Sequence, residues 1–242
     1  MSTKLIYLED FTILTHKAMI ESFTLGEDGR TTLVLNETIF YPQGGGQPYD
    51  QGTITSPSGT FLVEEVRFVD GIVNHIGHFE SGTFSVGETV ACSVNKERRD
   101  LNSRIHSAGH VVDMGVGALG LNWKPGKGYH FPDGPYVEYE GTFGEIDKEK
   151  LKTDLEMACN VFVQENRTTT LRFMPKEEMH TVCTHVPDYL PEGKPARVVF
   201  YGDYGVPCGG THVSQLGDIR HLTIRKIKTK GSVIQVAYDV ER

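Results

Sequence analysis

The sequence lacks closely spaced cysteines, a signal peptide and any long apolar segment. Its four cysteines lie far apart in the chain, at Cys92, Cys159, Cys183 and Cys208. Such spacing is not that of a small disulfide framework and favours a reducing compartment. The N-terminus has no apolar core of the kind that a signal peptide needs, and no apolar run approaches the roughly 20 residues that cross a bilayer. We therefore expect a soluble, cytoplasmic protein without a membrane partner.

An excess of positive charge is also missing. The 242 residues contain 24 Lys and Arg against 32 Asp and Glu, which gives a formal net charge of −8. A protein that coats nucleic acid needs a basic surface, so this total argues against that class. The whole acidic excess, however, lies in residues 1–95, whereas residues 96–242 hold 20 side chains of each sign. The charge pattern therefore favours residues 96–242 as the surface that would contact RNA.

What is present is a glycine-rich chain with many short β-prone segments. It contains 27 glycines and is 38% hydrophobic, which is too much glycine for a helical bundle and too apolar for a disordered chain. Up to about residue 95, short apolar runs alternate with Gly and Asp turns, as in a small barrel or sandwich. The exception is the loop over residues 41–52, in which three consecutive glycines stand between Gln43 and Gln47.

Residues 95–242 predict a different organisation. Apolar residues at spacings of three and four indicate a helix from Asn95 to about Leu119, and a second from Asp147, its expected N-cap, to about Glu165. Strand candidates lie near 136–141, 168–174, 196–201, 219–227 and 232–239. We expect an α+β protein, with a small N-terminal β-barrel over 1–94 and, over 95–242, helices packed on an antiparallel sheet.

Two short motifs from distant parts of the chain offer side chains that bind zinc. In HSAGH, His106 and His110 lie one helical turn apart on the same face. In CGGTH, two glycines allow the backbone to turn so that Cys208 and His212 converge. Three imidazoles and one thiolate fit tetrahedral coordination of one Zn²⁺ per chain. The helical pair lacks the glutamate of zincin proteases, and the spacing leaves open whether the site is structural or hydrolytic.

These motifs, together with the glycine-rich segment Phe40–Gly52, resemble the editing domain of alanyl-tRNA synthetases. The resemblance is closer still to the medium-length class of AlaX-type trans-editing proteins, to which Pro125–Tyr139 is also similar. It covers essentially the whole chain and implies a small barrel joined to an editing domain shared with threonyl-tRNA synthetases. The zinc ligands that it implies are His106, His110, Cys208 and His212.

The resemblance also implies an activity. It implies hydrolysis of the ester at the acceptor end of misacylated tRNA(Ala), chiefly Ser-tRNA(Ala) and also Gly-tRNA(Ala), without a nucleotide cofactor. Zinc would either activate water or polarise and orient the substrate. Correct Ala-tRNA(Ala) must be spared, and it differs from the serine ester by one hydroxyl. Because sites that hydrogen-bond a hydroxyl discriminate far better than apolar slots, we expect a small polar pocket.

Several residues beside the metal motifs are candidates for this pocket. An amide can hydrogen-bond an ester, a hydroxyl or water without adding charge, which makes Gln47 and Gln43 catalytic candidates together with Thr211. The expected substrate-binding residues are Gly45, Gly46, Ser107 and His130. Two departures from the family pattern bear on selectivity: the helix reads HSAGH where synthetases usually have HTATH, and Gln43 stands where many relatives carry Glu.

Two basic clusters are candidates for tRNA phosphate contacts. One opens the long helix and continues in the loop after it, and the other spans 220–230, with five basic residues and no acidic one. Phosphate contacts of this kind would make binding sensitive to salt. The predicted contacts are Arg98, Arg99, Lys127, Arg225, Lys226 and Lys228. The competing interpretation of each cluster is ordinary solvated charge.

The leading hypothesis is thus a zinc-dependent aminoacyl-tRNA deacylase that acts in trans. One alternative is a tRNA-binding module whose zinc is structural, and another is a deacylase for a different tRNA such as Ser-tRNA(Thr). A set of charged tRNAs would separate the enzyme hypotheses. Nothing in the sequence indicates an oligomeric state.

Overall fold

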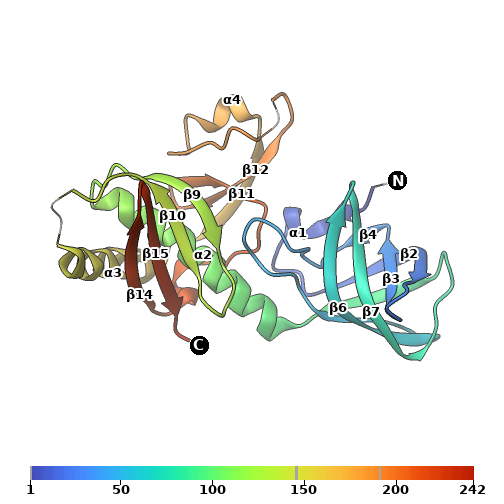
Figure 1. Ribbon diagram of the computed structural model, residues 1–242. Coiled ribbons are helices and arrows are strands. Elements are labelled where there is room, and N and C mark those ends of the chain that lie inside the picture. Colours follow the sequence, from blue (N-terminus) through green and yellow to red (C-terminus); the bar gives the residue numbers. More distant parts are fainter. Residues whose placement is uncertain (1, 145–146, 191) are drawn as a thin grey trace. The chain divides into compact units, whose positions relative to one another are not determined.

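The computed structural model describes residues 2–144, 147–190 and 192–242, which divide into two compact units (Figure 1). The first unit is made of Met1–Gly44 and Pro48–Asp100, and the second of Gly45–Gln47 and Leu101–Arg242. The glycine-rich loop therefore leaves the first unit for three residues and returns to it. The domain boundary expected between residues 94 and 95 stays a prediction.

The first unit contains a closed six-stranded barrel in the order β2-β3-β7-β6-β5-β8, in which neighbouring strands are antiparallel. The barrel strands are β2 (Thr15–Leu25), β3 (Thr31–Leu35), β5 (Gly52–Ser56), β6 (Gly59–Val69), β7 (Ile72–Gly82) and β8 (Thr89–Val94). Outside it lie helix α1 (Ile6–Glu9) and the parallel pair of β1 (Lys4–Leu5) with β4 (Glu37–Thr38). The predicted N-terminal barrel is confirmed.

Strict alternation of side chains fills the barrel. Strand β8 alternates exposed and buried residues, with Val90, Cys92 and Val94 inside, because successive side chains of a strand point to opposite faces. One polar ring lies in this core: His75 is fully buried, with Nε2 2.8 Å from Thr38 Oγ1 and Nδ1 3.1 Å from the Leu33 carbonyl oxygen. A carbonyl only accepts, so Nδ1 donates to it and Nε2 accepts from the Thr38 hydroxyl. Both ring nitrogens are satisfied.

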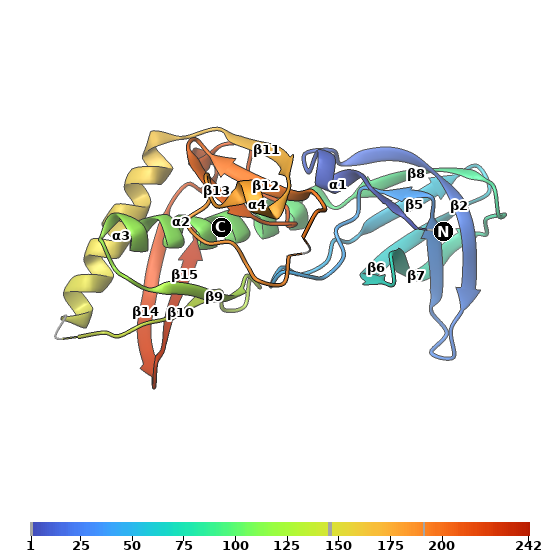
Figure 2. The ribbon, with the colours of Figure 1, turned by 90° about the horizontal axis from the view of Figure 1, so that it is seen from above.

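The second unit combines helices with two antiparallel sheets (Figure 2). A four-stranded sheet has the order β14-β15-β10-β9, formed by β9 (Lys124–Tyr129), β10 (Tyr136–Glu140), β14 (Leu222–Lys230) and β15 (Val233–Val240). A three-stranded sheet has the order β11-β12-β13, formed by β11 (Thr169–Met174), β12 (Ala196–Tyr201) and β13 (Tyr204–Pro207). The helices are α2 (Lys96–Ala118), α3 (Lys148–Glu165), α4 (Lys176–Met179) and the 3-10 helix η1 (Leu216–Ile219). The α+β fold class is confirmed.

The two long helices form where the sequence predicts them. Helix α2 begins with residues of the first unit and continues through the second, where Ile105, Ala108 and Val112 join one buried apolar cluster with the four-stranded sheet. Asp147 caps helix α3, since its Oδ1 accepts hydrogen bonds from the backbone N–H groups of Glu149 and Lys150. Helix α3 ends at Asn166, whose left-handed conformation, with φ 51°, stops the helical pattern.

Some elements depart from the expected pattern. Strand β14 begins at Leu222 instead of near 219, because Leu216–Ile219 forms the 3-10 helix first. Strand β9 has the sequence KPGKGY, which contains no apolar alternation and is held in the sheet by its pairing with β10. No helix among the described residues is long and apolar enough to cross a membrane.

Candidate metal centre

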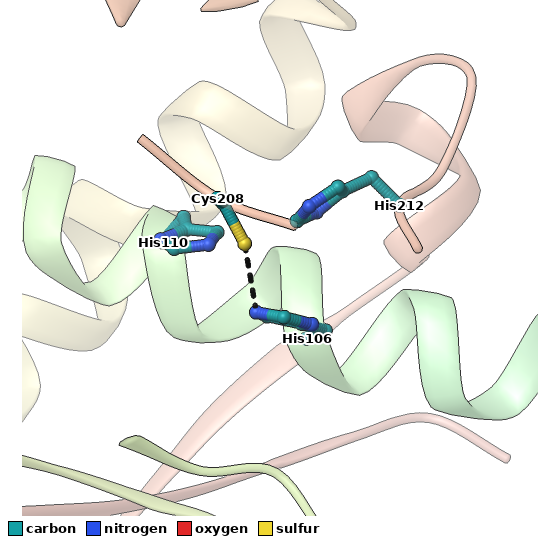
Figure 3. Close-up of side chains that lie close together, drawn as sticks. All are labelled: His106, His110, Cys208 and His212. Carbon is teal, nitrogen blue, oxygen red and sulfur yellow. Dashed lines mark hydrogen bonds between the residues drawn. The ribbon is translucent and has the colours of Figure 1, made fainter. Parts of the chain in front are cut away.

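Four side chains of the second unit converge into one group. His106 and His110 project from helix α2, and Cys208 and His212 come from the segment that follows strand β13 (Figure 3). One ligand atom from each residue lies within 4.8 Å of the others, and His106 Nε2 is 3.4 Å from Cys208 Sγ. The two motifs thus form a group that could hold a metal ion.

The chemistry of the group fits a transition metal. The three imidazoles are buried, and Cys208 is partly buried. Within the described part of the chain, the buried His110 Nε2 has no hydrogen-bond partner, and leaving such an atom unpartnered costs about 1–3 kcal/mol. A metal ion that replaces the proton on this nitrogen would be such a partner. Imidazole nitrogen and thiolate sulfur are common ligands of Zn²⁺ and of several other transition metals.

Gln47 fixes the orientation of His106. The Gln47 Oε1 atom lies 2.7 Å from His106 Nδ1, and because the amide oxygen only accepts, Nδ1 must carry the proton. His106 Nε2 is then the unprotonated nitrogen, and it faces Cys208. Gln47 is itself held on both sides by Thr211, which receives a hydrogen bond from Gln47 Nε2 and donates its backbone N–H to Oε1, each at 2.9 Å.

Gln47 and Thr211 are buried and hydrogen-bonded within the protein. We expected the Gln47 amide to face a substrate, but both residues are completely buried. The Gln47 amide is occupied by His106 and Thr211, and the Thr211 hydroxyl also lies 2.8 Å from Ser103 Oγ. Their contacts in the structure are those of residues that position His106. A direct catalytic role for either residue stays a prediction.

The other two imidazoles also have a polar partner at Nδ1. The Tyr201 hydroxyl lies 2.8 Å from His212 Nδ1. Asp113 Oδ2 lies 3.5 Å from His110 Nδ1, while Asp113 Oδ1 accepts a hydrogen bond of 2.6 Å from Tyr139. Partners of this kind orient a ring and select its tautomer in metal sites. Each histidine of the group is therefore oriented by a different neighbour.

The charges of the group are already suited to a metal. Burial lowers the pKa of His106 and of His212 well below the usual value, and the neighbouring cations add to this effect. Burial also lowers the pKa of His110, but Asp113 and Cys208 outweigh it and raise the value to about 9. Burial raises the pKa of Cys208, yet His110 and Arg197 lower it overall. The lowered pKa of Cys208 favours its thiolate, which is the form that binds metal.

Two glycines of the motifs are explained by close approach. A Cβ on Gly210 would overlap the His106 ring, and a Cβ on Gly109 would overlap the ring of His130. His130 is buried and stacks on His106 with ring centroids 4.5 Å apart, while its Nδ1 lies 2.6 Å from the Tyr238 hydroxyl. The glycine of HSAGH thus makes room for a fourth histidine against the metal group.

The remaining predicted pocket residues differ in burial and in their contacts. Ser107 is fully buried, and its Oγ accepts the Val213 N–H at 3.1 Å and lies 3.4 Å from His212 Nδ1. Gly45 is exposed with φ 52°, and Gly46 has φ 76° and accepts the His130 N–H at its carbonyl. Gln43 is an exposed residue of the first unit, so it is not among those that the second unit gathers.

The first basic cluster does not present all of its charges to solvent. Arg99 is only 2% exposed, and its guanidinium donates to the Asp50 carboxylate and to the carbonyls of Phe11 and Ile39. A guanidinium with these partners holds the first unit together, and a contact of Arg99 with a tRNA phosphate stays a prediction. Arg98 is half-buried and donates to the Tyr49 carbonyl at 2.8 Å.

The second basic cluster is exposed. Lys226 and Lys228 lie on strand β14 with exposed side chains, and so does Lys127 of the first cluster, which lies on β9. Arg225 is also exposed, although its guanidinium donates to the carbonyls of Tyr238 and Pro135. These four residues are placed where they could meet a ligand, and their contact with RNA stays a prediction.

Asp113, Tyr201 and Tyr238 were not among the candidates from the sequence. Asp113 stands three residues after His110 on one helix, so helical spacing alone could have indicated it. Tyr201 and Tyr238 lie on strands β12 and β15, and only the folded sheets bring them to the histidines. No local pattern in the sequence marks these two residues.

Two family models match the chain. The model described as tRNA synthetases class II (A) matches residues 7–98. The model described as Threonyl and Alanyl tRNA synthetase second additional domain matches residues 196–235, which include Cys208 and His212. The first match therefore falls on the barrel and the second on the C-terminal half of the metal group.

The chain is also similar to alanine–tRNA ligases. It is 33% identical over 216 residues to that of Anaeromyxobacter sp. (strain Fw109-5), covering 88% of this chain and 23% of the relative. It is 32% identical to those of Methanothrix thermoacetophila and Methanosphaera stadtmanae, covering 80% and 90% of this chain. The chain spans 21% and 24% of the length of these two relatives. The resemblance to alanyl-tRNA synthetases indicated by the motifs is confirmed.

Proposed function

We propose, on the premise that this chain is an AlaX-like protein related to one region of the alanine–tRNA ligases, that it hydrolyses the ester of misacylated tRNA(Ala) in trans. Its substrates would be chiefly Ser-tRNA(Ala) and also Gly-tRNA(Ala), bound at the acceptor end without a nucleotide cofactor. The barrel over 1–94 and the domain over 95–242 would work as one editing module. The observation that carries the proposal is the convergence of His106, His110, Cys208 and His212 within 4.8 Å.

We assign one Zn²⁺ to this group. The assignment is supported by the donor set and by the buried His110 Nε2, which lacks a protein partner among the described residues. Zinc, when bound, would supply a Lewis acid beside the ester. Gln47, Asp113 and Tyr201 would keep His106, His110 and His212 in the orientations that ligation needs.

Selectivity would come from polar groups around this centre. The proposed pocket residues are Gly45, Gly46, Ser107 and His130, of which His130 lies directly against His106. An ester with a serine hydroxyl could pair with a polar group of the pocket, whereas an alanine ester would leave that group unpaired. A difference of one hydrogen bond to a polar site is enough for strong discrimination between the two esters.

The decisive experiment measures deacylation of several charged tRNAs by the zinc-loaded protein. Ser-tRNA(Ala) should lose its amino acid well above the spontaneous rate, and Ala-tRNA(Ala) should not. Ser-tRNA(Thr) and Gly-tRNA(Ala) in the same assay define the tRNA and amino-acid preference. If Ser-tRNA(Ala) decays only at its spontaneous rate, the proposed activity is wrong.

A tRNA-binding module with a structural metal is the second candidate. It is favoured by the four available protein ligands, because a structural zinc site is closed by four such ligands. The variant His106→Ala separates the two functions. Loss of fold and RNA binding, without any deacylation by the unaltered protein, would favour the structural role.

A further inference from the structure

Helix α3 and strand β14 pack against each other in the second unit (Figure 1). A basic pocket lies between them. Its volume is about 560 Å³, within the range of ligand sites. Its charged lining residues are Lys148, Glu149, Lys152, Arg225, Lys226 and Lys228. Five of these six side chains are cationic, so the pocket concentrates positive charge in a chain whose net charge is −8.

Two structural features gather these cations. Lys148 and Lys152 are one turn apart on helix α3 and therefore share a face. On strand β14, the pairing with β15 shifts register between Ile224 and Lys226, which leaves Arg225 without a paired residue. Such a bulge re-aims side chains, and it allows the consecutive residues Arg225 and Lys226 to line the same pocket.

The charges of the pocket are available to a ligand. Among the described residues, none of its five cations forms an ion pair, whereas the neighbouring Lys150 is paired with Asp154 at 2.5 Å. Lys148 donates to the Thr229 hydroxyl at 3.5 Å, and Arg225 donates to two backbone carbonyls, contacts that leave the cationic charge uncompensated. The single carboxylate, Glu149, cannot neutralise five cations.

Lysines on an edge strand have a second explanation. Strand β14 is at the end of its sheet, and charged residues there prevent edge-to-edge aggregation. That explanation covers Lys226 and Lys228 but not Lys148 and Lys152, which belong to a helix. Edge protection therefore does not explain why the helix lysines and the strand lysines line the same pocket.

We propose that this pocket binds consecutive phosphates of the tRNA backbone, with Lys148 and Lys152 of helix α3 acting together with Lys226 and Lys228 of strand β14. This proposal rests on the proposed function, because that function makes tRNA the expected ligand. It adds a binding surface separate from the metal group. Lysine binds phosphate through its point charge, so the pocket would bind RNA independently of the base sequence.

The test uses filter binding of uncharged tRNA(Ala) to the full chain between 50 and 200 mM salt. Lys148→Glu/Lys152→Glu should weaken binding at least about tenfold and reduce the slope of log K against log[salt] by about 1–2. Lys226→Glu/Lys228→Glu should do the same. Both helix substitutions lie in the first two turns, where a carboxylate is favourable, so the helix should persist.

Lys150→Glu is the matched control, compared with Lys152→Glu alone. Both positions are on helix α3 and both changes alter the charge equally, but Lys150 does not line the pocket. Lys150→Glu should change the affinity less than about twofold, because Lys150 lies outside the pocket lining and an exposed charge away from the ligand is screened by salt. Equal weakening by the two single variants would overturn the proposal, because it would show a general charge effect.

A small substrate separates this proposal from the deacylase function. The seryl ester of adenosine carries no phosphate, so pocket variants should hydrolyse it at the unaltered rate while the KM for Ser-tRNA(Ala) rises. If the unaltered protein deacylates Ser-tRNA(Ala) and the variants keep its KM, the pocket proposal fails and the function stands. If the unaltered protein binds tRNA in the pocket but deacylates nothing, the function fails and the pocket stands.

Discussion

Two buried histidines in different regions show how a structural imidazole differs from one built to bind a ligand. His75 lies in the barrel core, and both of its ring nitrogens are hydrogen-bonded, to Thr38 and to the Leu33 carbonyl. His110 lies in the second unit with only Asp113 beside its Nδ1, and its Nε2 has no hydrogen-bond partner in the described part of the chain. Both histidines are buried, but the hydrogen bonding of their ring nitrogens differs.

The pKa values of the two rings carry the same contrast. Burial lowers the pKa of His75 to about 4, so this ring stays neutral in the folded protein. Asp113 and Cys208 overcome burial at His110 and raise its pKa to about 9. His75 is a neutral, fully hydrogen-bonded ring that stabilises its own unit, whereas His110 lies beside a carboxylate and a cysteine that favour a positive charge at its position. Variants of His110, His75, Gln47 and Asp113 test this difference.

The largest effect should come from removing a ligand. His110→Ala should weaken zinc binding by more than the roughly 10–100-fold typical of losing an outer partner, and abolish measurable deacylation. Zinc content by mass spectrometry and a chelator titration measure it. His180→Ala, at an exposed histidine, is the control and should keep about one equivalent. Full zinc content in His110→Ala would remove His110 from the ligand set.

His75→Leu should isolate the contribution of the barrel histidine to the pH dependence of stability. The folded pKa of His75 is about 4 against 6.5 in the unfolded chain, so below pH 6.5 the unfolded state binds the extra proton. The stabilisation is complete above pH 6.5 and is lost between pH 6.5 and 4, by about 3 kcal/mol in the free energy of unfolding. Denaturant unfolding of metal-free wild type and His75→Leu should give curves that converge in this range. Parallel curves would contradict the assignment.

Gln47→Ala should have an intermediate effect. It removes the acceptor that fixes His106, which should weaken zinc binding about 10–100-fold while excess zinc restores deacylation. Gln47→Glu keeps an acceptor at the same place and should lose less than Gln47→Ala. A chelator titration of both variants decides this. Deacylation that stays absent at saturating zinc would instead favour direct contact of Gln47 with the substrate.

Asp113→Asn should have the smallest effect of the series. The Asp113 carboxylate is 3.5 Å from His110 Nδ1, longer than the 2.7 Å between Gln47 and His106, so its hold is weaker. Zinc affinity should fall by no more than about tenfold. An effect of Asp113→Asn larger than that of Gln47→Ala would reverse the ranking that the distances indicate.

Features that depend on neighbouring residues in the sequence were predictable. The helix over Lys96–Ala118 follows from its own apolar spacing, and that spacing also places His106 and His110 on one face. The turn that brings Cys208 to His212 follows from two consecutive glycines. These local patterns were enough to assemble the metal group before any fold was known.

Features that depend on distant partners were not predictable. Arg99 stands in a basic run that suggests a surface, but Asp50, 49 residues earlier, pairs with it in the core of the first unit. Gln47 was a candidate site residue from the sequence. Its partner Thr211 lies 164 residues away, so the hydrogen bond between them could not be predicted. Local sequence states which charges and amides exist but not which of them are already occupied.

The excursion of the glycine-rich loop also limits how this protein can be divided. Gly45–Gln47 belongs to the second unit although the chain on both sides of it belongs to the first. A fragment that begins at residue 95 would contain all four candidate ligands but would lack the amide that holds His106. Such a fragment would lack the residue that positions His106, so cutting the chain at residue 95 would alter the metal group.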